Sequence, residues 1–329
     1  LQESGEPIMG KAIAALTLLA LLCCPCLCAQ QSLGDRLHAY YDGLCKERGW
    51  QELQLTVDGL QRKLIWRAPK GPWVKGAIIA LHGGGGACSN WGATIRLGRA
   101  KVAFSEQALQ RGFAIFALDS TDGLAKDEKG RSFGKRWAST YIPKVKNIDL
   151  PFIDKVVDSV IPKLRPQKSS RSIYMTGISN GGFTTILYAT HYPQKIRAFA
   201  PVACGDPYGT YMDMGTRPLL ERKKAPGVFR DIETNIKVNE RGAAYSPTYP
   251  NEHPWPQRAS EKTPFKQFHH QQDALCDYSL MIKARKQLRA HGYPDEGPFI
   301  LRDRRRAFKH HFWQYEYNKP LLDFFEKYK

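Results

Sequence analysis

Short, wholly apolar runs alternate along this chain with stripes of apolar residues at helical spacing. The runs at 77–81 and 113–118 and the segment 173–175 are continuous, as expected for strands buried on both faces of a sheet. Between them, apolar residues recur every three or four positions, which is typical of helices packed on a core. The same patterns predict further strands within 53–68, with a turn at Asp58-Gly59, and at 198–203, 264–268 and 299–301, and helices at 30–50, 101–111, 150–164, 184–193, 277–291 and from about Pro320.

Strands that alternate with helices indicate the α/β class, with a mostly parallel sheet covered by helices on both faces. One large domain over residues 30–329 fits this rhythm. Residues 205–262 interrupt it with prolines and aromatic residues and show little periodicity. Because such a length is unusual for a connection in a compact domain, we expect this insertion to form a lid or a pocket wall.

The first 29 residues have the composition of an export signal. Lys11 precedes an apolar run, and small residues gather near Ala29, where cleavage is expected. The residues before Met9 resemble sequence upstream of the true start. An uncleaved membrane anchor is the alternative, but Pro25 and the shortness of the run argue against a spanning helix. The prediction is therefore a secreted, extracellular protein without stable membrane insertion.

Charge and cysteine content narrow the class of partners. The formal net charge is +18, which suits polyanions, but no nucleic-acid-binding motif accompanies it and a solvated basic face is favoured. The cysteines beyond the signal have no C-x-x-C spacing, so a zinc site is not expected. In an exported chain they allow up to two disulfides in three possible pairings, with free buried thiols as the alternative. These cysteines are Cys45, Cys88, Cys204 and Cys276.

The stretch RSIYMTGISNGGF at 171–183 holds the most specific chemical signal. It contains G-x-S-x-G from Gly177 to Gly181, between a predicted strand and a predicted helix. A strand-to-helix turn of this kind strains the backbone and lifts the serine hydroxyl clear of it. The alternative is an ordinary glycine-rich turn, which the flanking elements disfavour. Ser179 is therefore the predicted nucleophile.

A serine nucleophile needs a histidine base, and in sheets of this kind the chain order is serine, acid, histidine. Among the histidines after Ser179, only His310 and His311 lie between the last predicted strand and the last predicted helix. Adjacent side chains on a loop point in different directions, and both residues remain candidates. We favour His311.

The acid that orients the histidine should follow an earlier strand. Asp273 follows the strand predicted to end near Phe268 and precedes a helix. Asp277 is the nearest rival, although it is also suited to cap that helix. Asp206 and Asp213 are more distant rivals. We favour Asp273.

Attack by the serine creates an oxyanion, which requires backbone N–H donors. The N–H of Asn180, directly after the nucleophile, is the first expected donor. The second should come from the glycine run after His82, where missing side chains let the backbone approach the substrate. Gly84 is favoured, and Gly85 is close behind. A flexible loop is the alternative for this run, but it directly follows a buried strand.

These segments resemble the α/β-hydrolase fold of secreted esterases, the group that includes polyhydroxybutyrate depolymerases and feruloyl or acetylxylan esterases. The resemblance implies H-x-W at the catalytic histidine, which His311 to Trp313 matches and which supports His311. It implies H-G-x-x-D at the acid, where this chain has H-H-Q-Q-D, with His270 in place of glycine. The matching pieces lie at 78–86, 149–157, 172–193, 199–205, 268–279 and 310–313.

The sequence therefore predicts a secreted serine hydrolase of carboxylic esters that needs no metal and no organic cofactor. The resemblance implies feruloyl or acetyl esters on polysaccharide, or hydroxyalkanoate polyester, as substrates. A prolyl-oligopeptidase-like peptidase is a second hypothesis, which the lack of a propeller-length N-terminal region disfavours. A catalytically silent binding protein is a third, which the complete serine, acid and histidine set disfavours. The oligomeric state is left open.

Overall fold

The structure is a computed structural model, and a large part of the chain is described in it. The described residues are 33–93, 98–121, 136–139, 141, 147–208, 255–256, 262–304 and 307–329, with the two-residue strands Tyr211–Met212 (β7), Phe229–Arg230 (β8), Lys237–Val238 (β9) and Tyr245–Ser246 (β10). The predicted signal region and most of the predicted insertion lie outside them. The chain divides into two units, Leu1–Leu37 and His38–Lys329, and the second unit contains the sheet and its covering helices. Within the described residues, no helix is both long and apolar enough to cross a membrane.

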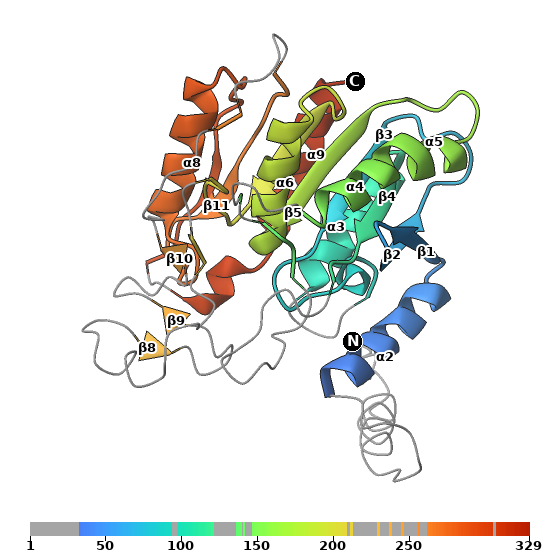
Figure 1. Cartoon of the computed structure of the whole chain (residues 1–329), viewed down its shortest axis with the longest axis horizontal. Coiled ribbons are helices and arrows are strands. Elements are labelled where there is room, and N and C mark those ends of the chain that lie inside the picture. Colours follow the sequence, from blue (N-terminus) through green and yellow to red (C-terminus); the bar gives the residue numbers. More distant parts are fainter. Residues whose placement is uncertain are drawn as a thin grey trace, which may run out of the picture. The chain divides into compact units, whose positions relative to one another are not determined.

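The centre of the second unit is an eight-stranded sheet in the order β1-β2-β4-β3-β5-β6-β11-β12 (Figure 1). The first two strands form an antiparallel hairpin, β2 joins β4 antiparallel, and the strands from β4 to β12 run parallel. The predicted parallel sheet is confirmed. The strands are β1 Gln51–Val57, β2 Leu60–Arg67, β3 Gly76–Leu81, β4 Phe113–Leu118, β5 Ile173–Ile178, β6 Ala198–Val202, β11 Phe268–His270 and β12 Phe299–Leu301.

The predicted turn at Asp58-Gly59 closes the β1–β2 hairpin. Both residues have positive φ, 50° at Asp58 and 76° at Gly59. Two-residue hairpin loops favour such dihedrals because they match the twist of the flanking strands, and aspartate followed by glycine tolerates them best. The hairpin register therefore follows directly from this dipeptide.

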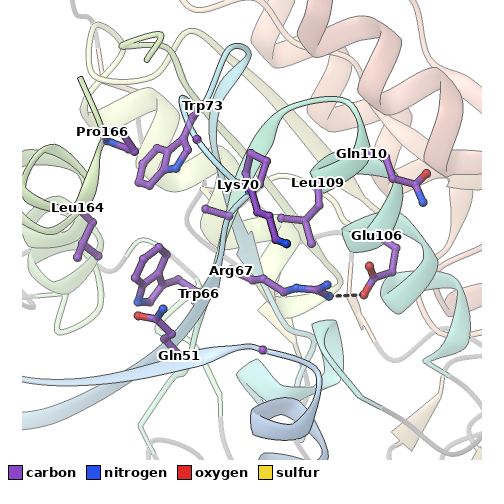
Figure 2. Close-up of a pocket in the computed structure, with 14 residues that line it drawn as sticks. Gln51, Trp66, Arg67, Lys70, Trp73, Glu106, Leu109, Gln110, Leu164 and Pro166 are labelled. Atoms are coloured by element: carbon purple, nitrogen blue, oxygen red, sulfur yellow. Dashed lines mark hydrogen bonds and ion pairs between the residues drawn. The ribbon is translucent and has the colours of Figure 1, made fainter. Parts of the chain in front are cut away.

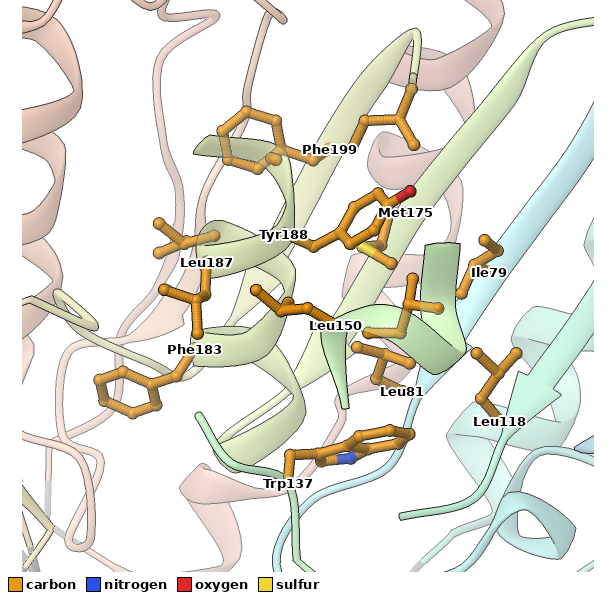
Figure 3. Packing of buried hydrophobic residues seen from close by; sticks show 14 of the residues in the cluster. Ile79, Leu81, Leu118, Trp137, Leu150, Met175, Phe183, Leu187, Tyr188 and Phe199 are labelled. Carbon is orange, nitrogen blue, oxygen red and sulfur yellow. The ribbon is translucent and has the colours of Figure 1, made fainter. Parts of the chain in front are cut away.

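Helices cover both faces of the sheet, as predicted, and the strand residues divide between them. Ile79 and Leu81 of β3 belong to the core under α4, α5, α6 and α8 (Figure 3). Ile78 and Ala80 belong to the opposite core, under α3 and α9. Burial on both sides explains why these strands are continuous apolar runs. The helices are α2 Leu33–Glu47, α3 Arg99–Gln110, α4 Leu150–Lys155, α5 Ile161–Leu164, α6 Asn180–His191, α8 Tyr278–Ala290 and α9 Tyr315–Lys327.

The helix predicted over 150–164 is present but is not uniform. A π-helical turn, Val156–Val160, separates α4 from α5. Pro162 lies two residues after its end, and proline lacks the N–H that would bond the carbonyl of Asp158 in a regular helix. The wider turn lies where that hydrogen bond would be lost.

Two predicted boundaries were wrong, and proline is involved in both. The strand predicted at 264–268 is instead β11 at Phe268–His270, and Phe265 makes only isolated bridges. Pro264 has no N–H for the sheet ladder, so regular pairing begins beyond it. The last helix begins at Tyr315, and Pro320 lies inside it. Its buried side chains, including Tyr317 ahead of the proline, hold α9 on the sheet.

No disulfide joins the four cysteines of the described chain, contrary to the expectation of up to two. All four are buried thiols outside any disulfide, which is the alternative that the sequence allowed. Burial raises the pKa of Cys45 to about 12, and it raises the pKa values of Cys204 and Cys276 well above the ordinary thiol value. The thiols of Cys45, Cys204 and Cys276 therefore stay protonated and act as packing groups.

Candidate active site

Ser179 lies in the predicted sharp turn between a buried strand and a helix. β5 ends at Ile178, α6 begins at Asn180, and Ser179 between them has φ 54° and ψ −121°. A positive φ in a residue other than glycine is a strained conformation that persists only where the surroundings enforce it. The Ser179 N–H donates to the carbonyl of Val202 on β6 at 2.9 Å, which ties the turn to the neighbouring strand.

Two glycines let this turn close tightly on itself and pack against the end of β3 and the loop after it. A Cβ atom on Gly177 would overlap the carbonyl of Gly181, and one on Gly181 would overlap the carbonyls of Leu81 and His82. Any larger residue would push the two backbones apart. The glycines of the motif thus set the position of Ser179 relative to the predicted oxyanion loop.

The structure brings Asp273 and His311 together. Asp273 Oδ2 and His311 Nδ1 are 2.8 Å apart, and the Asp273 side chain is fully buried. The other carboxylate oxygen accepts the N–H groups of Leu275 at 2.7 Å and Cys276 at 2.9 Å. Burial alone would raise the pKa of Asp273, but the charge of His311 and these hydrogen bonds outweigh it, and the pKa is lowered. The carboxylate therefore stays ionised and fixes the His311 ring.

His310 has different neighbours. Both histidines lie in the short 3-10 helix Phe308–His311, between β12 and α9. The ring of His310 stacks on that of His270, with centroids 3.8 Å apart, and its Nε2 lies 3.2 Å from Asp303 Oδ2. Of the two candidate bases, only His311 has this carboxylate bond to Asp273. Its role as the base stays a prediction.

His270, the departure from the family pattern, is accommodated without disturbing Asp273. Burial and the charge of His310 lower the pKa of His270 from 6.5 to about 4, so its ring is neutral at neutral pH. Its Nδ1 accepts the N–H of Gln272 at 3.1 Å. The stacked pair His270–His310 lies beside the loop that carries Asp273.

The rival aspartates have other partners. Asp277 is the N-cap of α8 and accepts the N–H of Ser279 at 2.9 Å. Asp206 accepts the N–H of Tyr208 at 2.8 Å and the indole N–H of Trp255 at 3.3 Å. Asp213 lies outside the described residues. Of the candidate acids that are described, Asp273 is the one hydrogen-bonded to a candidate base.

One predicted oxyanion donor, Asn180, directly follows Ser179, and the loop that holds the other passes nearby. A Cβ on Gly83 would lie 3.6 Å from that of Ser179, so the loop leading to Gly84 passes close to the serine side chain. The N–H of Asn180 belongs to the first residue of α6, where the helix offers it no acceptor. The Asn180 side chain accepts the N–H of Trp137 at 2.7 Å and donates to Ser139 Oγ at 2.5 Å. The roles of Asn180 and Gly84 stay predictions.

His82 holds this loop in place. Its Nε2 accepts the N–H of Ser120 at 3.1 Å, which leaves the proton on Nδ1, where it donates to the carbonyl of Gly83 at 2.7 Å. Both ring nitrogens are thus engaged with backbone groups. His82 fixes the end of β3 against the end of β4.

Arg136 and Trp137 are two site residues that the sequence reasoning missed. A Cβ on Gly84 would lie 2.7 Å from an Nη atom of Arg136, so this buried guanidinium rests on the predicted oxyanion loop. The Trp137 indole donates to the carbonyl of His82 at 2.9 Å. Both residues follow a stretch rich in Gly, Lys and Asp with no periodicity, where the only available signal was a single tryptophan.

Comparisons with known proteins support the fold. No family model and no curated protein sequence matches the chain. A solved 2,6-dihydroxy-pseudo-oxynicotine hydrolase is 17% identical, with a TM-score of 0.52 over 90% of this chain and 73% of that one. Est1E from Butyrivibrio proteoclasticus with ferulic acid bound is 18% identical, with a TM-score of 0.49 over 84% of this chain and 96% of that one. A thermostable esterase is 14% identical, with a TM-score of 0.49 over 84% of this chain and 62% of that one.

At 17% identity, the likeness to the 2,6-dihydroxy-pseudo-oxynicotine hydrolase shows the fold alone. The order of the sheet, the helices on both faces and the strand-turn-helix at Ser179 are those of the α/β-hydrolase fold. The chain has that fold. The reaction has to be argued from its own residues.

Proposed function

We propose that this protein is a secreted serine hydrolase that acts on carboxylic esters. The observation that carries the proposal is the 2.8 Å bond between Asp273 and His311, at the sheet edge where the strained Ser179 lies. Asp273 follows β11 and Ser179 follows β5, and the carboxyl ends of parallel strands share one edge. Export rests on the predicted signal region, outside the described residues.

In the proposed mechanism, Ser179 Oγ attacks the ester carbonyl carbon while His311 Nε2 accepts the hydroxyl proton. Asp273 holds the other ring nitrogen and stabilises the imidazolium that forms. The N–H groups of Asn180 and Gly84 bind the oxyanion of the tetrahedral intermediate. His311 then protonates the departing alcohol, and a water molecule, activated by the same ring, releases the acid.

We assign the substrate to esters of polymeric or polymer-derived molecules. The family resemblance favours feruloyl or acetyl esters on polysaccharide, or hydroxyalkanoate polyester, and the net charge of +18 favours an acidic polymer. A peptidase would use the same three residues against an amide. A binding protein would use the fold without turnover.

Activity toward esters and amides separates these functions. We expect the mature chain to hydrolyse p-nitrophenyl acetate, to react with a fluorophosphonate probe, and to leave a peptide p-nitroanilide intact. Acid released from feruloylated xylan, acetylated xylan and polyhydroxybutyrate then identifies the polymer. Amide turnover at a rate comparable with the ester would support the peptidase, and no turnover together with no labelling would support the binding protein.

His311→Ala and His310→Ala form a matched pair of variants. His311→Ala should lower kcat/KM on p-nitrophenyl acetate by about 10³-fold or more, because it removes the proton acceptor. His310→Ala should cost less than about tenfold, because the residue stacks on His270 instead of bonding Asp273. Steady-state kinetics on both variants check this. If His310→Ala were the more damaging change, the assignment of the base would be wrong.

A further inference from the structure

A hollow lined by the residues drawn in Figure 2 lies toward the end of the sheet where β3, β4 and β5 begin, away from Ser179. Its volume is about 640 Å³, and its walls come from the end of β2, the connector to β3, the end of α3 and the segment before β5. The parallel strands β3, β4 and β5 begin beside it and end at the candidate active site. Each has six residues, so about 17 Å of strand lies between their two ends.

A tryptophan held rigidly in place forms part of the wall of this hollow. The Trp66 ring stacks on Phe116, with centroids 5.7 Å apart and planes 9° from parallel, and Trp73 packs beside it at 6.3 Å. Trp66 is half-buried and lies next to its strand partner Gln51 (Figure 2). An indole whose orientation is fixed in advance presents a flat apolar surface at low entropic cost. Such a surface suits the C–H face of a pyranose ring.

Polar groups on the other side of the end of β2 suit hydroxyl and carboxylate groups (Figure 2). Arg67 Nη1 and Glu106 Oε1 are 2.6 Å apart and both are partly exposed, so they offer donors and acceptors at one rim (Figure 2). Lys70 is exposed and forms no ion pair with any residue in the described part of the chain. The Arg67–Glu106 pair is neutral overall, and Lys70 therefore leaves the hollow with net positive charge.

More positive charge lies just beside the hollow. Arg165 sits between the wall residues Leu164 and Pro166. Its partial burial and, after it, the like charge of Arg171 lower the pKa of its guanidinium, but an arginine stays protonated at neutral pH. An aromatic platform, paired hydrogen-bonding groups and surplus cations together fit an acidic sugar better than a lipid or an apolar peptide.

We propose that this hollow is an accessory binding site for an acidic polysaccharide. One sugar of the polymer stacks on Trp66. On the other side of the end of β2, the hydroxyl groups of a neighbouring uronate bond the Arg67–Glu106 pair, and its carboxylate meets Lys70. The site holds the polymer on the protein at a distance from Ser179. The binding does not depend on ester hydrolysis, but its use to the protein rests on the proposed function.

The test compares Lys70→Glu with Lys286→Glu, which reverses the same charge at an exposed position on α8. Affinity electrophoresis through glucuronoxylan and calorimetry with a glucuronate-bearing xylo-oligosaccharide measure binding. We expect the wild type and Lys286→Glu to bind alike, and Lys70→Glu to bind about tenfold to a hundredfold more weakly. Trp66→Phe should weaken binding in the same assays with less risk to folding than alanine.

Turnover of p-nitrophenyl acetate should be unchanged in all three variants, since the hollow is remote from Ser179. This readout separates the two proposals: lost binding with normal turnover supports the accessory site, whereas absent turnover in the wild type contradicts only the proposed function. Equal weakening by Lys70→Glu and Lys286→Glu would show general attraction to a basic surface and overturn the site. Equal affinity for an unsubstituted xylo-oligosaccharide, or no binding by the wild type, would also overturn it.

Discussion

Ser179→Ala is expected to abolish ester turnover while leaving the fold intact. The substitution removes the only atom that attacks the substrate, so kcat/KM on p-nitrophenyl acetate should fall by at least ~10⁴-fold. Labelling by the fluorophosphonate should disappear as well. Alanine accepts the backbone conformation of Ser179, with φ 54°, about as well as serine does, and the midpoint of urea unfolding should stay close to that of the wild type.

Ser105→Ala is the matched control, because Ser105 is a buried serine on α3 whose hydroxyl donates to the carbonyl of Lys101 at 3.2 Å. It should retain both turnover and labelling. Turnover in Ser179→Ala above about a hundredth of the wild-type value would assign the reaction to another nucleophile.

Asp149→Ala is expected to have the largest effect on stability, a loss of about 3–5 kcal/mol in the free energy of unfolding. Asp149 Oδ1 lies 2.5 Å from Arg62 Nη2, and both side chains are buried, with 0% and 1% exposed. Its other oxygen accepts the N–H of Ala138 at 2.5 Å. Removing the carboxylate leaves a buried guanidinium without its counter-charge and frees the segment next to Trp137.

Urea unfolding monitored by circular dichroism measures this loss. Lys319→Ala is the control, because Lys319 and Asp323 are also close, at 2.6 Å, but are 75% and 43% exposed. That change should cost less than about 0.5 kcal/mol. The double variant Arg62→Met/Asp149→Leu should be more stable than Asp149→Ala, since neither buried charge remains. A loss below about 1 kcal/mol in Asp149→Ala would mean that water or another group compensates Arg62.

The strands of the sheet were predictable because a strand buried on both faces has a continuous run of apolar residues, as in residues 113–118. The boundaries of the helices were less predictable from the sequence. The start of α9 at Tyr315 depends on the packing of Tyr317 and on the bond from the Trp313 indole to Asn318 at 2.7 Å. Such contacts form only in the folded chain, so the periodicity of apolar residues does not predict them.

In the candidate site, too, local motifs were predictable and contacts between distant residues were not. Ser179 was found from a local motif, because the strained turn needs glycines at fixed spacing. The order serine, acid, histidine led to Asp273, but the choice between His310 and His311 depends on a 3-10 turn, where neighbouring residues point about 120° apart. The stacking of His310 on His270 is a contact across 40 residues. Arg136 was missed for the same reason, since its relation to Gly84 exists only in the folded chain.

The contact between the serine turn and the loop after β3 also bears on how such a protein can change its specificity. Main-chain atoms at Gly181, Leu81 and His82 make this contact, so no side-chain rotamer adjusts it. If Ser179 is the nucleophile, substitutions elsewhere in the substrate-facing loops can then alter which substrate is accepted without displacing Ser179 from the predicted oxyanion donors. The reacting geometry and the recognition of substrate are in this sense separate modules, and a directed-evolution library should keep Gly177 and Gly181 fixed and vary the loops.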